Sequence, residues 1–340
     1  MQGFVIERWG SDPRWSEIDE PRPGPGDVLV LVEACGVGLT VINCINGDLA
    51  SDPDLLPRVP GHELVGRVVE LGEGVDPALL GRRVVAYFYL FCGQCHWCRS
   101  GREQRCDNLA GWVGVHRDGG YAPLTVLPER QLVPIPDGVD PVAATVIADA
   151  VATPVHVAGV AGIGPDDRVV VIGAGGGVGI HMVQVARHAG AEVVGLDVGD
   201  AKAAVIERFG ARPVESGTDL DPHLFGGTRP TVVVDFVGTA ATAAWAVTAL
   251  DAGGRMVALT TFPGRPATFQ HRDLVFREIS LLGSRYATRA EVVEAAGLVA
   301  DGHVTPVIGA VAPPADVLGI HDELRDGTLI GRGALDWSNA

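Results

Sequence analysis

The sequence predicts an α/β fold joined to a β-rich region, in two domains. Three observations lead to this prediction. The chain has 340 residues, which is too long for one small core. Its first third is rich in β-forming residues that Gly and Pro interrupt. From residue 168 onward, short apolar strands alternate with helical patterns, which is typical of a doubly wound parallel sheet.

The first third contains three segments that we expect to be strands. They are residues 28–34, 65–71 and 84–89, each rich in Val and Leu or aromatic residues. The proline- and glycine-rich run at 21–26 is typical of a turn-rich connection. This part of the chain is therefore expected to be mainly β.

The second part carries the βαβ pattern. Residues 169–172 are continuously apolar, as in strands buried on both faces of a parallel sheet. A glycine run follows, and helical periodicity then begins at residue 180. We expect helices at 180–188, 201–209 and 289–300, and further strands at 193–196, 231–236 and 255–259.

Composition excludes some classes of function. The formal net charge of −16 argues against a nucleic-acid partner, because phosphate backbones are bound by basic surfaces. The longest apolar stretch, 142–163, contains Asp149 near its middle, and a carboxylate is costly inside a bilayer. We therefore expect buried protein there and no membrane partner. No basic, apolar leader opens the sequence, so a cytoplasmic location is expected.

Four of the six cysteines lie in one fifteen-residue stretch with the spacing C-x2-C-x2-C-x7-C. They are Cys92, Cys95, Cys98 and Cys106. Short C-x2-C steps let one loop direct several thiolates at a tetrahedral Zn²⁺ ion. Disulfides or free thiols are the alternative, but cysteines three residues apart bridge poorly. Four thiolates close the coordination shell, so the predicted zinc is structural.

A glycine run lies between the strand at 169–172 and the following helix, which is where a dinucleotide-binding loop belongs. There the backbone turns sharply, and a pyrophosphate can approach N–H groups at the helix N-terminus. The spacing fits G-x-x-G-x-x-G better than G-x-G-x-x-G. The predicted cofactor-binding residues of the run are Gly173, Gly175, Gly176, Gly177, Val178 and Gly179.

An acidic residue supports this interpretation. Asp197 ends the second predicted strand of the pattern, 18 residues after Gly179, where a carboxylate can accept hydrogen bonds from ribose hydroxyls. No Arg or Lys at 198–200 would bind a 2′-phosphate, so we predict NAD over NADP. An ordinary turn residue is the alternative for Asp197. Lys202 is a candidate ribose contact or a solvated helix residue.

The segment G-H-E-L-V-G at 61–66 precedes the cysteine loop and the glycine run, in an order that resembles the zinc-containing alcohol dehydrogenases of the medium-chain dehydrogenase/reductase superfamily. The resemblance covers essentially the whole chain. It implies a GroES-like catalytic domain (1–153 and 284–340, with a zinc lobe at 92–106) and an inserted Rossmann domain (154–283). It also implies that Arg332 contacts the cofactor pyrophosphate.

The resemblance also directs attention to a catalytic metal. In that family the zinc takes a cysteine, the histidine of G-H-E, and a third cysteine or aspartate, so His62 and Asp149 become ligand candidates. From the residues alone, a packed core histidine and a helix N-cap are the alternatives. The first ligand position, however, is Gly38. Neither Cys35 nor Cys44 stands where it would replace the missing thiolate.

Two outcomes follow for this metal. Glu63 is next to His62, so His62, Glu63 and Asp149 could form a nitrogen–oxygen zinc site that is weaker than one with a thiolate. Otherwise the site has lost its metal. Two zinc ions per chain would indicate the first outcome, and one zinc ion per chain, which we favour, would indicate the second.

The expected reaction is NAD(H)-dependent hydride transfer with an alcohol or carbonyl substrate. By family position Thr40 is the proton-relay hydroxyl, whereas Asn43 replaces a relay histidine and cannot act as an acid or base. Without zinc, reduction of a polarised C=C or C=N bond becomes the alternative, with His62 or Thr40 as the donor. The candidate pocket residues suggest an apolar substrate and are Leu39, Val41, Tyr89 and Trp112.

The partners expected from the resemblance are a small-molecule substrate and further copies of the chain, as a homodimer or homotetramer. A non-catalytic NAD-binding protein on the same scaffold is the remaining alternative. NADH binding without turnover would indicate it.

Overall fold

The structure, a computed structural model, describes residues 1–217, 220–260 and 266–338. It divides into two compact units. Unit 1 comprises Met1–Asp149, Thr288–Gly302 and Ile308–Ala340, and unit 2 comprises Ala150–Ala287 and His303–Val307. The domain boundaries predicted after residues 153 and 283 remain a prediction.

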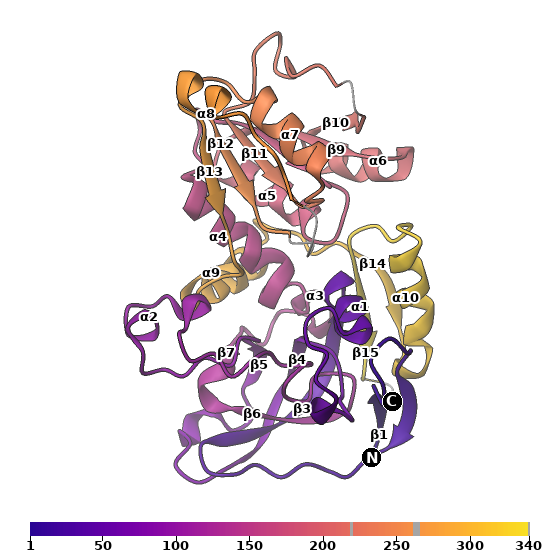
Figure 1. The fold of residues 1–340 in the computed structure, drawn as a ribbon. Coiled ribbons are helices and arrows are strands. Elements are labelled where there is room, and N and C mark those ends of the chain that lie inside the picture. Colours follow the sequence, from indigo (N-terminus) through magenta and orange to yellow (C-terminus); the bar gives the residue numbers. More distant parts are fainter. Residues whose placement is uncertain (218–219, 261–265, 339–340) are drawn as a thin grey trace. The chain divides into compact units, whose positions relative to one another are not determined.

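Unit 1 is built on a mainly antiparallel sheet to which both halves of the chain contribute (Figure 1). The strands of its main path, in spatial order, are β14 (Ile308–Ala312), β15 (Arg332–Asp336), β3 (Asp27–Val37), β4 (Glu63–Leu71), β5 (Arg83–Ala86) and β7 (Leu132–Pro134). β6 (Leu124–Pro128) also pairs with β3, and β1 (Gln2–Val5) pairs with β2 (Arg14–Glu17) in a separate hairpin.

The long strand β3 organises the site because it pairs with two strands that carry candidate residues. Its end segment aligns Gly36 with Glu63 of β4, and Val37 with Gly333 of β15. These four residues therefore lie on neighbouring strands at one end of the sheet. Directly after β3, Gly38 caps the N-terminus of helix α1 (Leu39–Asn46).

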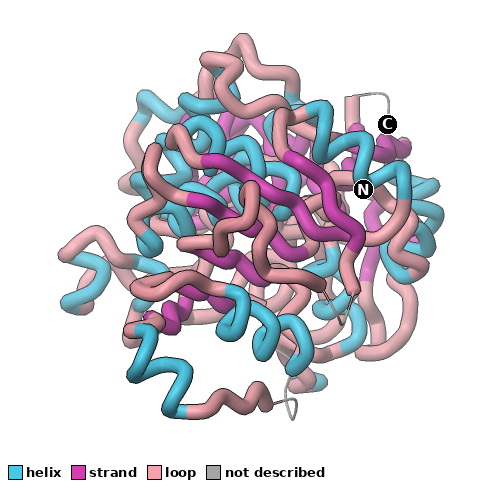
Figure 2. Tube along the Cα trace, turned by 90° about the horizontal axis from the view of Figure 1, so that it is seen from above, coloured by secondary structure: helices cyan, strands magenta, loops and turns pink. Residues whose placement is uncertain are grey.

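Unit 2 contains a six-stranded parallel sheet with helices on both faces, which confirms the predicted parallel α/β architecture (Figures 1 and 2). The strands in spatial order are β10 (Arg212–Glu215), β9 (Glu192–Asp197), β8 (Arg168–Ile172), β11 (Val232–Asp235), β12 (Arg255–Ala258) and β13 (Ser280–Gly283).

The strands of unit 2 are apolar on both faces because helices cover both. Val169 and Val171 of β8 pack in one buried cluster with α4 (Ala152–Ala161), α5 (Gly179–His188) and α6 (Asp200–Arg208). Val170 and Ile172 pack in a second cluster on the opposite face. That cluster involves α7 (Ala240–Ala249) and α8 (His271–Arg277).

The remaining helices belong to unit 1 or its borders. They are α2 (His96–Arg99), α3 (Pro141–Ala144), the π-helix η5 (Ile147–Val151), α9 (Arg289–Ala300) and α10 (Val317–Arg325), with single 3₁₀ turns at Pro53–Leu55, Pro77–Leu79, Glu103–Arg105, Glu129–Gln131 and Pro314–Asp316.

Most predicted elements are present within one or two residues of their expected ends. Two strands differ by more: β3 continues to Val37, three residues past the end predicted at 34, and the strand predicted at 84–89 is shorter, because β5 ends at Ala86. Beyond Ala86 the backbone leaves the sheet, and its amides bond to loops: Tyr87 N donates to Gln131 O, and Leu90 N to Gly111 O. The aromatic pattern there reflects a buried loop and not a strand.

The apolar stretch near Asp149 is helical and mostly buried. The helical segment Pro141–Ala161 is long and apolar enough to cross a membrane by composition, but 78 % of its most apolar window is buried inside the protein. This burial agrees with the expectation that the stretch packs within the protein.

Candidate active site and metal centres

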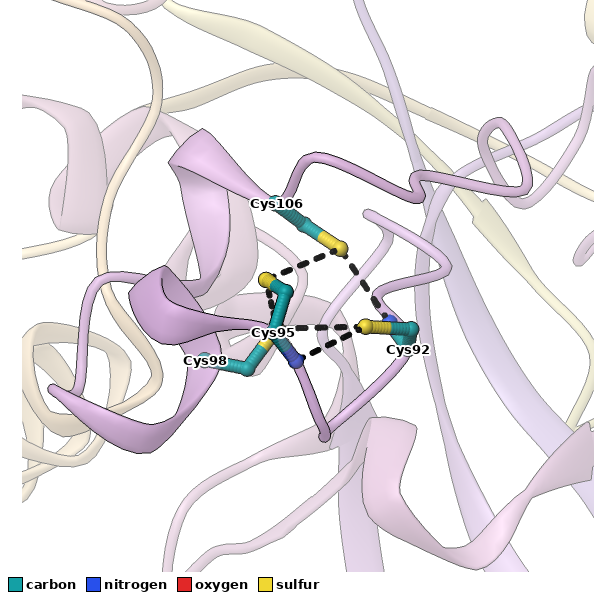
Figure 3. A group of neighbouring side chains, drawn as sticks. All are labelled: Cys92, Cys95, Cys98 and Cys106. Carbon is teal, nitrogen blue, oxygen red and sulfur yellow. Dashed lines mark hydrogen bonds between the residues drawn. The ribbon is translucent and has the colours of Figure 1, made fainter.

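Four cysteines of the 92–106 loop point toward one another (Figure 3). Neighbouring sulfurs are 3.5 Å apart between Cys95 and Cys98, and 3.9 Å apart for the pairs Cys92–Cys98 and Cys95–Cys106. Four sulfurs about 2.3 Å from a tetrahedral zinc ion would be separated by ~3.8 Å. No disulfide forms among the six cysteines, all of which lie in the described residues.

The loop backbone also favours thiolates. The amides of Gln94 and Cys95 donate to Cys92 Sγ at 3.4 and 3.3 Å, and these bonds lower the pKa of the Cys92 thiol to about 6. A hydrogen bond from the backbone likewise lowers the pKa of Cys95, whereas partial burial raises the pKa of both Cys98 and Cys106. The four donors fit a Zn²⁺ ion, which would brace the loop.

A second cluster contains His62, Glu63 and Asp149, whose ligand-type atoms all lie within 4.8 Å of one another. His62 directly precedes β4, Glu63 is the first residue of β4, and Asp149 lies on the π-helix η5. A π-turn inserts an extra residue into a helix and is frequent at functional sites. The structure thus brings together the three candidate ligands that the sequence indicated.

Arg332 of β15 already supplies a cation to this cluster. Its Nη2 lies 2.6 Å from Glu63 Oε1 and 2.8 Å from Asp149 Oδ2, and its Nε lies 2.9 Å from Glu63 Oε2. Burial alone would lower the pKa of Arg332, but the charges of Glu63 and Asp149 outweigh burial and raise it. The expected contact of Arg332 with a cofactor pyrophosphate stays a prediction.

Two glycines make room for this ion pair. A Cβ at Gly38 would collide with the Arg332 guanidinium, and a Cβ at Gly36 would lie 2.5 Å from Glu63 Oε2. Gly38 has φ −137° and ψ 177°, an extended conformation open to any residue. Its side-chain space, and not its backbone, therefore requires glycine.

As it is arranged, the cluster does not fit the catalytic metal that the resemblance implies. The thiolate position is Gly38, and Arg332 bonds to both carboxylates that would have to bind an ion. Cys44 does not compensate, because its Sγ donates to Gly114 O and burial raises its pKa to about 12.

His62 differs from the other members of the cluster, because one of its ring nitrogens has no hydrogen-bond partner among the described residues. Its Nε2 is buried without a hydrogen bond among the described residues, 3.6 Å from Asp149 Oδ2. The ring meets Phe88 edge-on at a centroid distance of 4.6 Å. Phe88 contacts Tyr89, which contacts Trp112, so an aromatic row begins at His62.

The other residues predicted for this site lie on α1 or near it. Thr40 is partly buried in the first turn of α1, two residues after Gly38, whereas Asn43 is exposed on the same helix. Leu39 is exposed and Val41 is buried. Thr40 is therefore close in sequence to the residue that packs against Arg332, and its relay role stays a prediction.

In unit 2 the glycine run turns from β8 into α5. Asp197 Oδ2 accepts a hydrogen bond of 2.8 Å from Gly175 N, and its Oδ1 lies 3.2 Å from Lys202 Nζ. A Cβ at Gly175 would meet the Lys202 side chain at 2.6 Å, and one at Gly179 would collide with Gly173 O. The predicted acidic residue thus contacts the loop itself.

Sequence reasoning missed two features of these sites. Arg332 was expected to face a cofactor, and nothing in the sequence indicated that it pairs with Asp149. His181 was not singled out, although it lies two residues after Gly179. Its Nδ1 donates to Gly177 O at 2.7 Å, and its Nε2 accepts from Val307 N at 3.1 Å. These two hydrogen bonds fix His181 as the neutral tautomer with its proton on Nδ1, and they connect the glycine run to residue 307.

Comparison with known proteins agrees with this geometry. The profile of the alcohol dehydrogenase GroES-like domain matches residues 24–137, and that of the zinc-binding dehydrogenases matches residues 177–301. An alcohol dehydrogenase of Geobacillus stearothermophilus is 31 % identical over 339 residues, covering 98 % of both chains.

Solved structures agree as well. The acetophenone reductase of Geotrichum candidum in complex with NAD has a TM-score of 0.86 and 31 % identity, over 100 % of this chain and 98 % of that one. The cobalt- and zinc-bound alcohol dehydrogenase of Pyrobaculum aerophilum has a TM-score of 0.89 and 30 % identity, over 99 % of each chain.

These likenesses confirm the GroES-like and Rossmann-type domains, and they support NAD as the cofactor and the four-cysteine cluster as a structural zinc site. The chain belongs to the zinc-containing alcohol dehydrogenases of the medium-chain dehydrogenase/reductase superfamily and is an NAD-dependent oxidoreductase of that type.

Proposed function

We propose that this chain transfers hydride between nicotinamide C4 and an apolar alcohol or carbonyl substrate at a site centred on His62. The observation that carries the proposal is His62 Nε2, which is buried without a hydrogen bond among the described residues. Leaving such a group unpaired costs about 1–3 kcal/mol, so an unpaired nitrogen in a native site calls for a functional explanation. A substrate oxygen would supply the missing partner.

The apolar character of the substrate is supported by the aromatic row beside His62. Phe88 and Tyr89 have ring centroids 5.2 Å apart, and Tyr89 and Trp112 have centroids 6.0 Å apart. One solved relative is named as an acetophenone reductase, which supports an aromatic ketone as the first substrate to test.

In the proposed reduction, bound NADH would supply the hydride for the carbonyl carbon, and the carbonyl oxygen would take up a proton. His62, with its proton on Nε2, donates a hydrogen bond to that oxygen and stabilises the charge that develops there. The Thr40 hydroxyl delivers the proton and recovers it from water. Oxidation of the alcohol runs the same steps in reverse. No step passes through a metal, because the donors present do not fit one.

A second reaction is favoured by the position of Arg332. Both carboxylates of the cluster are bonded to its guanidinium, so the substrate would meet a hydrogen-bond donor instead of a Lewis acid. Such a site suits a double bond that is already polarised. Reduction of an enone, quinone or iminium is therefore the alternative.

An NADH assay of the pure full chain tests both reactions. The panel contains acetophenone-type ketones, conjugated enones and, with NAD⁺, the matching alcohols. We expect His62→Ala to lower kcat/KM for the best substrate by about 10²-fold or more while NADH affinity is unchanged. His271→Gln, an exposed histidine of α8, is the control.

Turnover of enones alone would select the second reaction. Normal turnover by His62→Ala would remove His62 from the mechanism. NADH binding without turnover of any compound would instead support a non-catalytic NAD-binding protein.

The preference for NAD over NADP is proposed to come from Asp197. Its carboxylate, with 11 % of the side chain exposed and Lys202 beside it, would bind ribose hydroxyls and repel a 2′-phosphate. Paired assays with NADH and NADPH test this. Equal or better turnover with NADPH would contradict it.

We also propose a cytoplasmic homo-oligomer. Six unbridged cysteines support a reducing compartment. The edge strand β13 of the parallel sheet, with Leu281 exposed, supports association through unit 2. Light scattering of the pure protein would give the order of the oligomer, and a monomer at every concentration would contradict this proposal.

A further inference from the structure

We propose that Arg332 is the resident cation of the His62–Glu63–Asp149 cluster, and that it excludes a catalytic metal from this site. The chain would then bind one zinc ion, in the Cys92–Cys106 loop. The catalytic meaning of this inference rests on the proposed function, but its test counts metal ions and needs no turnover.

The first argument is the use of the carboxylate oxygens. Arg332 Nη2 sits between Glu63 Oε1 and Asp149 Oδ2, at 2.6 and 2.8 Å, and Nε takes Glu63 Oε2 at 2.9 Å. A zinc ion would need these oxygens at about 2.0–2.2 Å. It would then lie beside a buried guanidinium that shares its sign of charge, in surroundings that screen little. One cation therefore excludes the other.

The second argument is the shape of the site around Arg332. Gly38 has an ordinary extended backbone, so no conformational constraint demands glycine there. A Cβ at that position would nevertheless collide with Cζ, Nη1 and Nη2 of Arg332. A cysteine ligand at 38 and the observed guanidinium position are mutually exclusive.

The third argument is the depth of the ion pair. Glu63 is completely buried, and the side chain of Arg332 is only 6 % exposed. Charges this deep must be compensated locally. Arg332 compensates both carboxylates from β15, the strand that pairs with β3 next to Gly38. Withdrawing Arg332 to admit a metal would break every one of these bonds.

The first test is a zinc count on the purified full chain by mass spectrometry, after growth with added zinc and dialysis without chelator. We expect one zinc per chain. The count should fall to zero in Cys106→Ser and stay at one in Asp149→Asn. Two zinc ions in the wild type, one of them lost in Asp149→Asn, would overturn the proposal.

The second test restores the thiolate with and without the cation. The double variant Gly38→Cys/Arg332→Ala should gain a second zinc, and Gly38→Cys/Arg332→Lys, which keeps a cation, should not.

A second zinc in Gly38→Cys/Arg332→Lys would show that a cation at position 332 does not exclude metal and would overturn the proposal. Circular dichroism checks that each variant is folded, and the wild-type count decides the question even where a variant is not. Absent turnover with one zinc per chain would count against the proposed function and leave this inference standing.

Discussion

The two clusters of metal-ligand residues in this chain differ in where their cation comes from. The cysteine cluster is built by one loop, and its four sulfurs stand 3.5–3.9 Å apart in the neighbouring pairs. The second cluster joins β4, the π-helix η5 and β15, and Arg332 lies between its carboxylates. Both groups have ligand atoms within 4.8 Å of one another. Proximity of ligand atoms therefore does not by itself identify a metal site.

The difference follows from charge. Four thiolates on a partly exposed loop repel one another unless a cation joins them, and the described residues of the loop place none among the sulfurs. The carboxylates of the second cluster already have a cation, because the guanidinium of Arg332 is a side chain of the protein itself. Removing the cation from each cluster should therefore destabilise different parts of the molecule.

The largest effect is expected from removing zinc from the cysteine loop. Structural zinc sites have apparent binding free energies on the order of 10 kcal/mol, so Cys106→Ser should lose the ion and unfold the 92–106 loop. Zinc content and protease cleavage within the loop measure this. Cys44→Ala, which removes a buried thiol outside the cluster, should keep its zinc. Full zinc content in Cys106→Ser would show that the loop binds zinc without Cys106 and would contradict this prediction.

The next largest effect is expected from removing the cation of the second cluster. Arg332→Ala removes the guanidinium that compensates the buried Glu63 carboxylate and pairs with Asp149, which should lower the free energy of unfolding by about 3–5 kcal/mol. Urea unfolding measures the loss. Arg22→Ala, a surface residue with 78 % of its side chain exposed, is the control and should change stability little. A loss below 1 kcal/mol would show that Arg332 is not the compensating charge.

The two clusters also differ in how far sequence could predict them. The cysteine spacing is local, so the presence of four ligands within fifteen residues predicts that their sulfurs meet at one point. The second cluster depends on register between β3, β4 and β15, which places Gly36 opposite Glu63 and Gly333 opposite Val37. The family motif supplied His62, Glu63 and Asp149, but only the tertiary structure places Arg332 among them.

The same distinction holds for the fold. The strands predicted at 169–172, 193–196, 231–236 and 255–259 and the helices predicted at 180–188 and 201–209 match unit 2 closely, because buried parallel strands and amphipathic helices have strong local patterns. The strands β10 and β13 and the helices α7 and α8 were not predicted. The predicted strand at 84–89 was too long, because β-forming aromatic residues also fill buried loops, as Tyr87 and Tyr89 do. The π-turn at Asp149 has no local signature that a helical pattern would reveal.

A smaller effect is expected at Thr40, which tests whether the second cluster works through a hydroxyl instead of a metal. Thr40→Val should lower kcat by about 10²-fold, because the proposed proton relay is lost, and should leave zinc at one per chain. Thr40→Ser keeps the hydroxyl and should restore most of kcat. Near-normal turnover by Thr40→Val would remove Thr40 from the mechanism.

The smallest effect is expected from Asp149→Asn, and it separates the two kinds of cluster most directly. An amide oxygen still accepts the hydrogen bond that Arg332 Nη2 now gives to Asp149 Oδ2 at 2.8 Å, while Glu63 keeps the charge pair. The free energy of unfolding should therefore fall by only about 1 kcal/mol. If Asp149 were instead a metal ligand, the same change would remove a bound ion. Parallel urea unfolding and zinc analysis distinguish these cases. A metal site would lose both zinc and stability in Asp149→Asn. If Asp149 only bonds to Arg332, the zinc count should stay at one per chain and the free energy of unfolding should change little.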